Sequence, residues 1–487
     1  MKLQKDCGIL LPISALPSPY GIGDLGEGAF RFVDFLAEAG QTYWQILPIG
    51  PTSYGDSPYQ SPSAFAGNPY FISLQSLQEE GLLTSEELAA AKEPAGSIDY
   101  AKLFVSREQV LRAAYKRFAP SEDYTAFIRH TPWLEAYALF CALKKKFALR
   151  PWNEWEKAYR DVHDAAVTQF AKEHEEELGY TYFVQYVFFR QWRALRAYAN
   201  ERGIKIIGDT PIYAAYDSAE VWARKALFLL RGSDPAAVAG VPPDYFSADG
   251  QKWGNPLYDW ENREAVFGYW KERLLHAVAL YDILRIDHFR AFADYYAVPP
   301  ENKTACGGVW HDGPGKALFD YLKREIGKLP ILAEDLGDLS EKARALPKAC
   351  GFPGMKVEQF GLLGDQKYNA HALCNYTKDF VGYTGTHDND TSLGWYRSLS
   401  ASEQAQVRKR VGKDIPLGMI KRLYQSRVRT AIVPMQDFLK QGAEHRINTP
   451  GTLGGNWQYR LEEIPPASAA ASIRALAEEH GRAPLRD

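Results

Sequence analysis

The most reactive combination of side chains lies at 281–290, which reads Tyr-Asp-Ile-Leu-Arg-Ile-Asp-His-Phe-Arg. Apolar residues on both sides of Arg285 indicate a buried strand, and Asp287 and His288 stand at its end. A charge in such a position costs desolvation free energy unless it is paired. Arg285 and Asp287 are two residues apart and share one face of the strand. They therefore predict either a structural ion pair or a reactive carboxylate beside its cation.

Other acidic residues stand at the ends of apolar runs in the same way. They are Asp209, Glu334, Asp335, Asp388 and Asp437, and His387 precedes one of them. Carboxylates that converge in a cleft favour either glycoside chemistry or a metal site. A metal site would use His or Asp at short spacing, whereas these acids are spread along separate strands. We therefore expect no metal, and we find no cofactor motif.

Glycosyl transfer through a covalent intermediate needs one ionised carboxylate as nucleophile and a second carboxyl kept protonated for the leaving oxygen. Arg285 is placed to hold Asp287 ionised. Glu334, on the adjacent strand, is then the candidate acid and base. The alternative for Glu334 and its neighbour Asp335 is a solvated strand end.

The order of elements predicts a (β/α)8 barrel with large, mostly helical insertions. Eight apolar runs are expected as strands, at 9–16, 43–49, 205–212, 281–290, 330–336, 355–362, 380–386 and 430–435. Helical periodicity is expected at 27–39, 103–118, 133–147, 170–200, 261–280, 316–326, 340–350, 402–424 (with a break at Pro416) and 468–480. An open doubly wound sheet is the alternative. It would want a G-x-G-x-x-G loop after an early strand, and the sequence has none there.

We expect residues 1–487 to form one catalytic barrel. The stretch 51–203, between strands two and three, is predicted to be a mostly helical inserted subdomain, because one crossover needs only one helix. The stretch 214–260 is predicted to be a loop insertion after strand three. Its part at 241–256 is rich in Gly, Pro and aromatic residues, which indicates a shaped loop or lid rather than a linker.

Composition excludes several classes of protein. The net charge of −3 argues against a nucleic-acid binder, which would carry a basic face. The five cysteines are scattered and odd in number, which favours reduced thiols and a cytoplasmic location. No run approaches the roughly 18 apolar residues of a membrane span. Trp, Tyr and Phe make up 13% of the chain, and many lie in loops, where they could either pack the loops onto the core or line a sugar-binding cleft.

Several longer motifs carry a specific resemblance. RIDHFR, AEDLG and GTHDND, at the fourth, fifth and seventh strand ends, resemble the catalytic motifs of the α-amylase type. PTSYGDSPYQS, GDTPIY, DYFSADGQKWGNPLYDW and NTPGTLGGNWQYR resemble the amylomaltases, or 4-α-glucanotransferases. The resemblance runs from about residue 8 to about residue 460. It implies no C-terminal β-domain, which agrees with the 27 residues that follow Arg460.

The resemblance also implies roles for particular residues. Asp287 would be the nucleophile, Glu334 the acid and then the base, and Asp388 the ligand of the hydroxyls of the reacting sugar. Arg285 and His387 would hydrogen-bond Asp287 and that sugar. The remaining implied substrate contacts are Asp209 and His288 with the sugars next to the reacting sugar, Tyr59 stacked on the reacting sugar, Gln251 and Trp253 on a mobile acceptor-side loop, Asn456 and Trp457 on a second loop, and Tyr54 and Tyr100 at a remote glucan-stacking site. Tyr54 and Tyr100 could instead pack the inserted subdomain.

The implied reaction is retaining transfer of 4-α-glucan segments, with maltooligosaccharides and amylose-like glucans as donors and another glucan or glucose as acceptor. The alternatives are a mainly hydrolytic enzyme with the same residues and a non-catalytic glucan-binding barrel. The last would be expected to have lost Asp287, Glu334 or Asp388, and all three are present.

Overall fold

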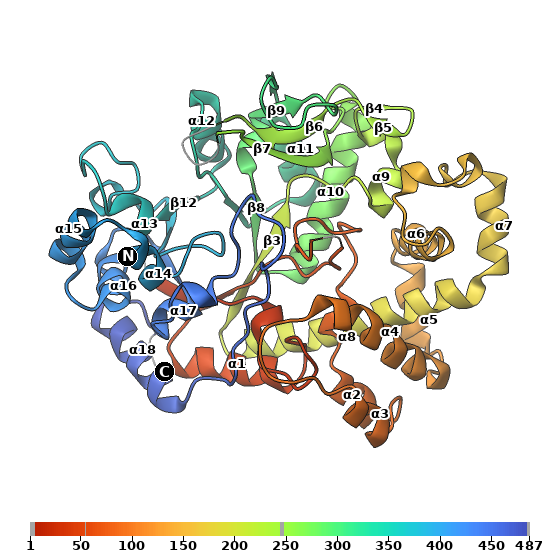
Figure 1. Cartoon of the computed structure of the whole chain (residues 1–487), viewed down its shortest axis with the longest axis horizontal. Coiled ribbons are helices and arrows are strands. Elements are labelled where there is room, and N and C mark those ends of the chain that lie inside the picture. The colour runs from red at the N-terminus through yellow and green to blue at the C-terminus, as the bar shows by residue number, and fades with distance from the viewer. Residues whose placement is uncertain (1–4, 54, 244–247, 485–487) are drawn as a thin grey trace.

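The structure is a computed structural model of the chain, and it describes residues 5–53, 55–243 and 248–484. Its centre is a parallel sheet of eight strands in the order β11-β8-β3-β2-β1-β14-β13-β12 (Figure 1). The strands are β1 (Asp6–Leu10), β2 (Tyr43–Gln45), β3 (Lys205–Pro211), β8 (Ile283–Asp287), β11 (Ile331–Ala333), β12 (Gly354–Val357), β13 (Phe380–Tyr383) and β14 (Thr430–Pro434).

The two end strands of this order, β11 and β12, lie together and close the sheet into a barrel. The N–H of Ala333 donates to the carbonyl of Pro353 at 2.9 Å. Asp335 bridges the same seam, because its carboxylate accepts the N–H of Met355 at 2.7 Å. A Cβ on Gly354 would lie 2.3 Å from that carboxylate, so the seam requires glycine there. The predicted (β/α)8 barrel is confirmed.

The strands are shorter than the apolar runs that predicted them. β1 ends at Leu10, and the residues that follow form a 3-10 turn at Ile13–Ala15 after Pro12, since proline cannot donate to a sheet ladder. β12 ends at Val357, and the rest of the predicted sixth strand forms the short helix α13 (Glu358–Gly361). Most residues of these segments are buried although they leave the sheet. Their apolar character therefore made the predicted strands too long.

Helices surround the barrel on the outside. They are α1 (Glu27–Glu38), α10 (Arg263–Leu280), α11 (Lys316–Ile326), α12 (Glu341–Cys350), α14 (Ser392–Ser398), α15 (Ala401–Val411), α16 (Ile415–Gln425), α17 (Met435–Phe438) and α18 (Ala467–Glu479). The predicted break in 402–424 falls before Pro416, which lies in the first turn of α16. A missing N–H is harmless there.

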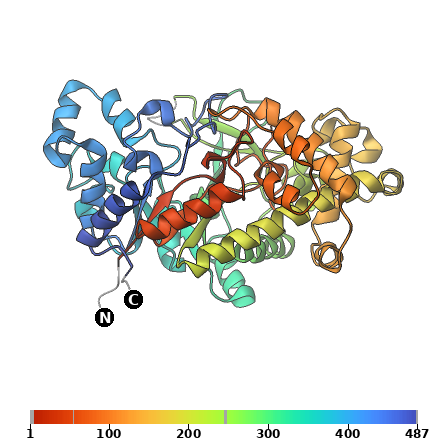
Figure 2. The ribbon, with the colours of Figure 1, turned by 90° about the horizontal axis from the view of Figure 1, so that it is seen from below.

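A helical region lies between β2 and β3 and forms the orange and yellow side of the molecule in Figure 1. It contains α2 (Leu74–Glu79), α3 (Ser85–Ala90), α4 (Tyr100–Arg117), α5 (Glu122–Arg129), α6 (Leu134–Lys146), α7 (Ala165–Glu173) and α8 (Glu175–Glu201). The single helix expected at 170–200 is two helices that meet at His174. α8 contacts α4, α5 and α6 and also α1 and β3 of the barrel, and Figure 2 shows it beside α1.

A second, antiparallel sheet covers one side of the barrel mouth. Its strands, in the order β10-β9-β6-β7, come from the segments after β3 and after β8: β6 (Val238–Val241), β7 (Gln251–Pro256), β9 (Asp294–Val298) and β10 (Val309–Asp312). The expectation of a loop at 241–256 is wrong for Gln251–Pro256. Pairing with β6 overrides the turn propensity of its Gly, Asn and Pro.

Smaller elements complete this region, namely α9 (Ala219–Ala223) and the hairpin of β4 (Leu230–Arg231) and β5 (Asp234–Pro235). Among the described residues, no helix combines the length and apolar character needed to cross a membrane.

Candidate active site

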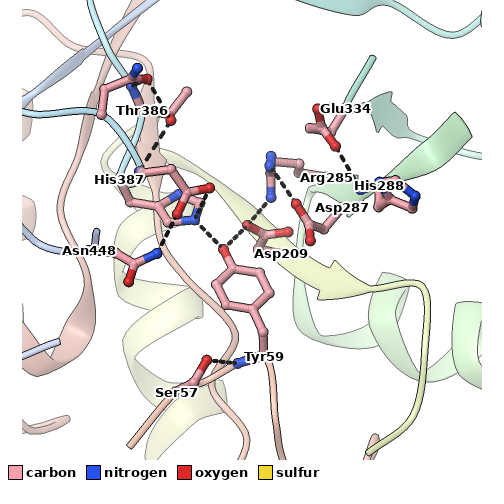
Figure 3. Close-up of polar contacts among 12 residues, drawn as sticks. Ser57, Tyr59, Asp209, Arg285, Asp287, His288, Glu334, Thr386, His387 and Asn448 are labelled. Atoms are coloured by element: carbon pink, nitrogen blue, oxygen red, sulfur yellow. Dashed lines mark hydrogen bonds and ion pairs between the residues drawn. The ribbon is translucent and has the colours of Figure 1, made fainter. Parts of the chain in front are cut away.

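The acids predicted at strand ends meet at the carboxyl end of the barrel (Figure 3). Asp209 lies within β3, Asp287 ends β8, Glu334 follows β11 and Asp388 follows β13. Parallel strands bring their carboxyl ends to one face of a barrel, which is where such folds build active sites. Four carboxyl groups, in or just after four strands, therefore gather at this end of the barrel.

Arg285 joins two of these carboxylates. Its guanidinium donates to Asp209 at 2.6 Å and to Asp287 at 2.8 Å. The side chain of Arg285 is only 3% exposed and that of Asp209 is fully buried, whereas Asp287 is 30% exposed to the cleft. The register explains the contact, since Asp209 and Arg285 are partners across β3 and β8. The predicted ion pair exists, and it holds Asp287 at the open end of the cleft.

Tyr59 connects this cluster to the seventh strand end. Its hydroxyl donates to Asp209 at 2.8 Å and lies 2.9 Å from Nε2 of His387. The two rings stack with centroids 5.3 Å apart. His387 Nε2 also lies 3.4 Å from a carboxylate oxygen of Asp388. The predicted hydrogen bond from His387 to Asp287 is not formed, because Nε2 faces Tyr59 and Asp388 and the buried Nδ1 has no partner among the described residues.

The loop after β13 is shaped by its own side chains. The N–H and hydroxyl of Thr386 both donate to the side-chain oxygen of Asn389 at 2.9 Å. The N–H of Asp388 donates to the same hydroxyl at 3.3 Å. This tight turn places His387 next to Tyr59 in Figure 3.

Glu334 is held by backbone donors. It accepts the N–H of His288 at 2.7 Å and the N–H of Leu336 at 2.8 Å. Burial, followed by the charge of Asp287, raises the pKa of Glu334 to about 8. A carboxyl group with this pKa carries a proton at neutral pH, which is the state that a general acid needs.

The pKa of Asp287 is shifted by opposing effects. Burial, and then the charges of Asp209 and Asp388, raise its pKa above the ordinary value, although Arg285 lowers it. Arg285 therefore favours the ionised form of Asp287, as predicted, but burial and the two neighbouring carboxylates outweigh its effect on the pKa. Arg285 nevertheless donates directly to Asp287, while Glu334 accepts neutral N–H groups. Asp287 is thus the member of the pair that ionises first.

The residues predicted on the acceptor side, Gln251 and Trp253, lie close to each other and to His288. Trp253 lies in β7, and its indole N–H donates to the side chain of Gln251 at 3.1 Å. The edge of its ring faces His288, with centroids 4.8 Å apart. His288 has a left-handed backbone (φ 52°), and burial lowers its pKa to about 3. Its buried Nε2 has no partner among the described residues, so the imidazole is neutral at neutral pH and has a ring nitrogen without a hydrogen bond.

The second predicted loop reaches the cleft through Trp457, whose ring centroid lies 5.8 Å from that of Tyr59. Asn456 turns its amide inward, since its oxygen accepts the N–H of Thr449 at 2.9 Å. Tyr100 is 8% exposed and donates its hydroxyl to the carbonyl of Trp457 at 2.9 Å. This arrangement supports the packing alternative for Tyr100. Tyr54 lies outside the described residues.

Three residues of the site were missed. The side-chain amide of Asn448 donates to the carboxylate of Asp388 at 2.6 Å. Arg446 donates to the main-chain oxygen of Asp388 at 2.7 Å. Asn448 opens the motif NTPGTLGGNWQYR, so the motif itself was a signal for it. Tyr213, from the motif GDTPIY, lies near Trp253 and His288, with ring centroids 6.4 and 6.5 Å away.

The two remaining strand-end acids have structural partners. Asp335 bridges the barrel seam, as described above. Asp437 is buried and accepts the hydroxyls of Thr384 and Ser392 at 2.6 and 2.7 Å. Within the described ranges, no three His, Cys, Asp or Glu side chains are grouped so that they could hold a metal ion.

A (β/α)8 barrel with a cation-paired carboxylate and a second carboxyl of raised pKa at its strand ends defines an enzyme that acts on glycosidic bonds. The model of the 4-alpha-glucanotransferase family matches residues 11–465. The chain belongs to this family, and it is an enzyme that transfers α-glucan segments.

Similar proteins match nearly the whole chain. The chain is 46% identical to a 4-alpha-glucanotransferase of Clostridium butyricum, across 96% of the chain and 99% of the relative. It is 44% identical to that of Thermus thermophilus, across 98% and 99%. Among solved structures, an amylomaltase from Streptococcus agalactiae in complex with acarbose superposes with a TM-score of 0.95 at 38% identity, covering 99% of this chain and all of the other.

Proposed function

We propose that Asp287 is the nucleophile and Glu334 the acid and base of a double displacement. It moves a 4-α-glucan segment from one α-1,4-glucan to the 4-hydroxyl of another glucan or of glucose. The observation that carries this assignment is the contrast between the two carboxyls. Asp287 receives a guanidinium at 2.8 Å, and Glu334 has a pKa raised to about 8.

In the first step a carboxylate oxygen of Asp287 attacks the anomeric carbon of the donor sugar. The glycosidic bond breaks, and its electron pair goes to the leaving oxygen, which takes the proton of Glu334. The leaving chain departs with a free 4-hydroxyl. A glycosyl ester on Asp287 and an ionised Glu334 remain.

In the second step the 4-hydroxyl of an acceptor replaces the leaving chain. Glu334 removes the proton of this hydroxyl as its oxygen attacks the anomeric carbon, and the ester bond to Asp287 breaks. The carboxylate of Asp287 and the proton of Glu334 are restored. Because both steps invert the anomeric carbon, the product keeps the α configuration of the donor.

Other residues are assigned to the reacting sugar or, in the case of Asp209 and His288, to the sugars next to it. Asp388 would bind its hydroxyls and favour the distorted, oxocarbenium-like form, with Tyr59 beside it. The buried atoms Oδ1 of Asp209, Nδ1 of His387 and Nε2 of His288 have no partners among the described residues. Buried polar atoms are normally hydrogen-bonded, and sugar hydroxyls would supply the partners that these three atoms lack.

Transfer requires that an acceptor hydroxyl, rather than water, reaches the ester. Water is present at about 55 M, so the enzyme must exclude it and hold the acceptor in place. Trp253 on β7 and Trp457 on the loop after β14 are the apolar covers we assign. Their places on opposite sides of the site, against His288 and against Tyr59, support this assignment.

The insertions are assigned to the walls of the cleft. We treat residues 51–203 as a helical inserted subdomain and 214–260 as the insertion that carries Trp253 on the acceptor side. Maltooligosaccharides and amylose-like α-1,4-glucans are the proposed donors, and glucans and glucose the acceptors. A cytoplasmic location is proposed from the five cysteines, all of which are free thiols.

Incubation with maltotriose tests the proposal. Transfer gives a ladder of longer maltodextrins together with glucose, whereas a mainly hydrolytic enzyme gives maltose and glucose without a ladder. Asp287→Asn should abolish both activities, because the variant cannot form the ester. A ladder of normal rate from Asp287→Asn would refute the assignment.

A further inference from the structure

Hydrogen bonds from a short segment after β14 hold Asp388 in place. The side-chain amide of Asn448 donates to Oδ1 of Asp388 at 2.6 Å. Arg446 donates to the main-chain oxygens of both residues, at 2.6 Å for Asn448 and 2.7 Å for Asp388. One three-residue segment therefore fixes both the backbone and the carboxylate of Asp388.

Asn448 stands at the base of a closed loop. The N–H of Trp457 donates to the carbonyl of Ile447 at 2.7 Å, which joins the two arms of the loop. Asn448 itself is 9% exposed, whereas the tip at 451–455 is exposed. The base of the loop is thus packed against the catalytic centre, and the tip is open to solvent.

The base is also tied to the helical insertion. Tyr100, the first residue of α4, donates its hydroxyl to the carbonyl of Trp457 at 2.9 Å. The N–H of Ile98 donates to the carbonyl of Gln458 at 3.0 Å. The position of Asn448 is therefore determined by the barrel on one side and by the start of α4 on the other.

We propose that Asn448 is a positioning residue of the transfer reaction, whose amide holds the carboxylate of Asp388 in the orientation that binds the reacting sugar. The inference rests on the proposed function, since it assumes that Asp388 touches that sugar. It explains why an amide is present at this point, because an amide N–H donates to a carboxylate without adding charge to a crowded cleft.

The geometry shows why such a partner is needed. The Asp388 side chain is 41% exposed, so neighbouring atoms confine it only in part. The terminal torsion of an aspartate is broad and does not select an orientation by itself. With Oδ1 on Asn448 and Oδ2 at 3.4 Å from His387, the carboxylate plane is fixed between two partners.

The charged and titratable groups that face Asp388 come from several elements. They are Asp287 at the end of β8, Tyr59 from the loop after β2, His387 beside it in the chain, and Arg446 at its main-chain oxygen. A new carboxyl at position 448 would enter a site with two carboxylates already present. It would keep a proton to a higher pH than usual, because a neighbouring carboxylate disfavours its ionised form.

The test is Asn448→Asp, which keeps the size of the side chain. At low pH the introduced carboxyl is protonated, and its O–H can donate to Asp388 as the amide does. As pH rises it ionises and repels Asp388. We expect kcat for maltotriose disproportionation to lie within about threefold of wild type near pH 5 and to fall about ten- to hundredfold below it at pH 8, with a much smaller change in KM.

Two further variants separate this role from a structural one. Asn448→Ala should lower kcat by a similar factor at every pH, because it removes the donor and adds no titrating group. Asn200→Asp is the matched control. Asn200 also donates to an aspartate, Asp282, at 3.0 Å, but at the amino-terminal end of the barrel strands. Its pH profile should keep the shape of the wild type.

The outcomes are distinct. If wild type forms the maltodextrin ladder but the Asn448→Asp profile runs parallel to it, the inference is overturned while the proposed function stands. If wild type forms no ladder, the proposed function fails and the inference fails with it. If Asn448→Asp does not fold, as judged by thermal unfolding, Asn448→Ala decides, and a kcat equal to wild type overturns the inference.

Discussion

Replacing Arg285 by Met should destabilise the protein strongly. Its guanidinium is 3% exposed and Asp209 is fully buried, so the variant leaves Asp209 in the interior without its cation. Oδ1 of Asp209 already has no partner among the described residues, and Oδ2 would keep only the hydroxyl of Tyr59. Breaking a buried ion pair on one side costs about 3–5 kcal/mol. The two charge-assisted hydrogen bonds, at about 1.5–3 kcal/mol each, give a similar total.

The assay is urea unfolding, followed by tryptophan fluorescence and by circular dichroism, on wild type, Arg285→Met, Asp209→Asn and the double variant. The double variant should be more stable than Arg285→Met alone by at least about 1 kcal/mol, because it no longer buries an unpaired carboxylate. Arg344→Met is the control, since its ion pair to Asp338 spans 3.9 Å with side chains 67% and 99% exposed. It should change stability by less than about 0.5 kcal/mol. A loss below about 1 kcal/mol in Arg285→Met would refute the reasoning.

Three further predictions concern the acid, the acceptor side and the amino-terminal ends of β1 and β14. The transfer rate of wild type should fall as pH rises through about 8, because Glu334 must be protonated in the first step and its pKa is raised to that value; a pH–rate profile that stays flat to about pH 9.5 would contradict this. Trp253→Ala should raise glucose release relative to chain redistribution from maltotriose, and an unchanged ratio would refute water exclusion by that ring. Arg482→Met should lower the free energy of unfolding by about 3 kcal/mol or more, because the fully buried Arg482 donates to main-chain oxygens of β1, of α16 and of the turn between α16 and β14. The ratio of glucose release to chain redistribution should not change. A melting temperature equal to that of wild type would contradict this prediction.

The barrel and its reactive strand ends could be predicted from the sequence, because parallel strands and amphipathic helices leave distinct patterns. Strand lengths could not. Most residues just after β1 and β12 stay buried after the chain leaves the sheet, and an apolar run does not mark where strand pairing stops. The strand at Gln251–Pro256 could not be predicted either, because its residues are typical of turns rather than of strands. Its turn-forming residues pair with β6, and such long-range pairing leaves no local signal.

The candidate site shows the same limit. The ion pair of Arg285 with Asp287 was predictable, because two residues on one strand face are neighbours by geometry. The net direction of the pKa shift of Asp287 was not, because it depends on burial and on the charges of Asp209 and Asp388. The bond between Asn448 and Asp388 joins residues 60 positions apart, so only the folded chain reveals it.

The covalent intermediate on Asp287 is the central claim, and trapping it is the most direct test. Glu334→Gln should be incubated with α-maltotriosyl fluoride, whose fluoride can leave without an acid. The ester should then form but persist, because no base activates the acceptor or water. Mass spectrometry of peptides should show the glycosyl adduct on the peptide with Asp287, and none when Asp287→Asn is added. An adduct on another residue, or the same adduct in the double variant, would contradict the account.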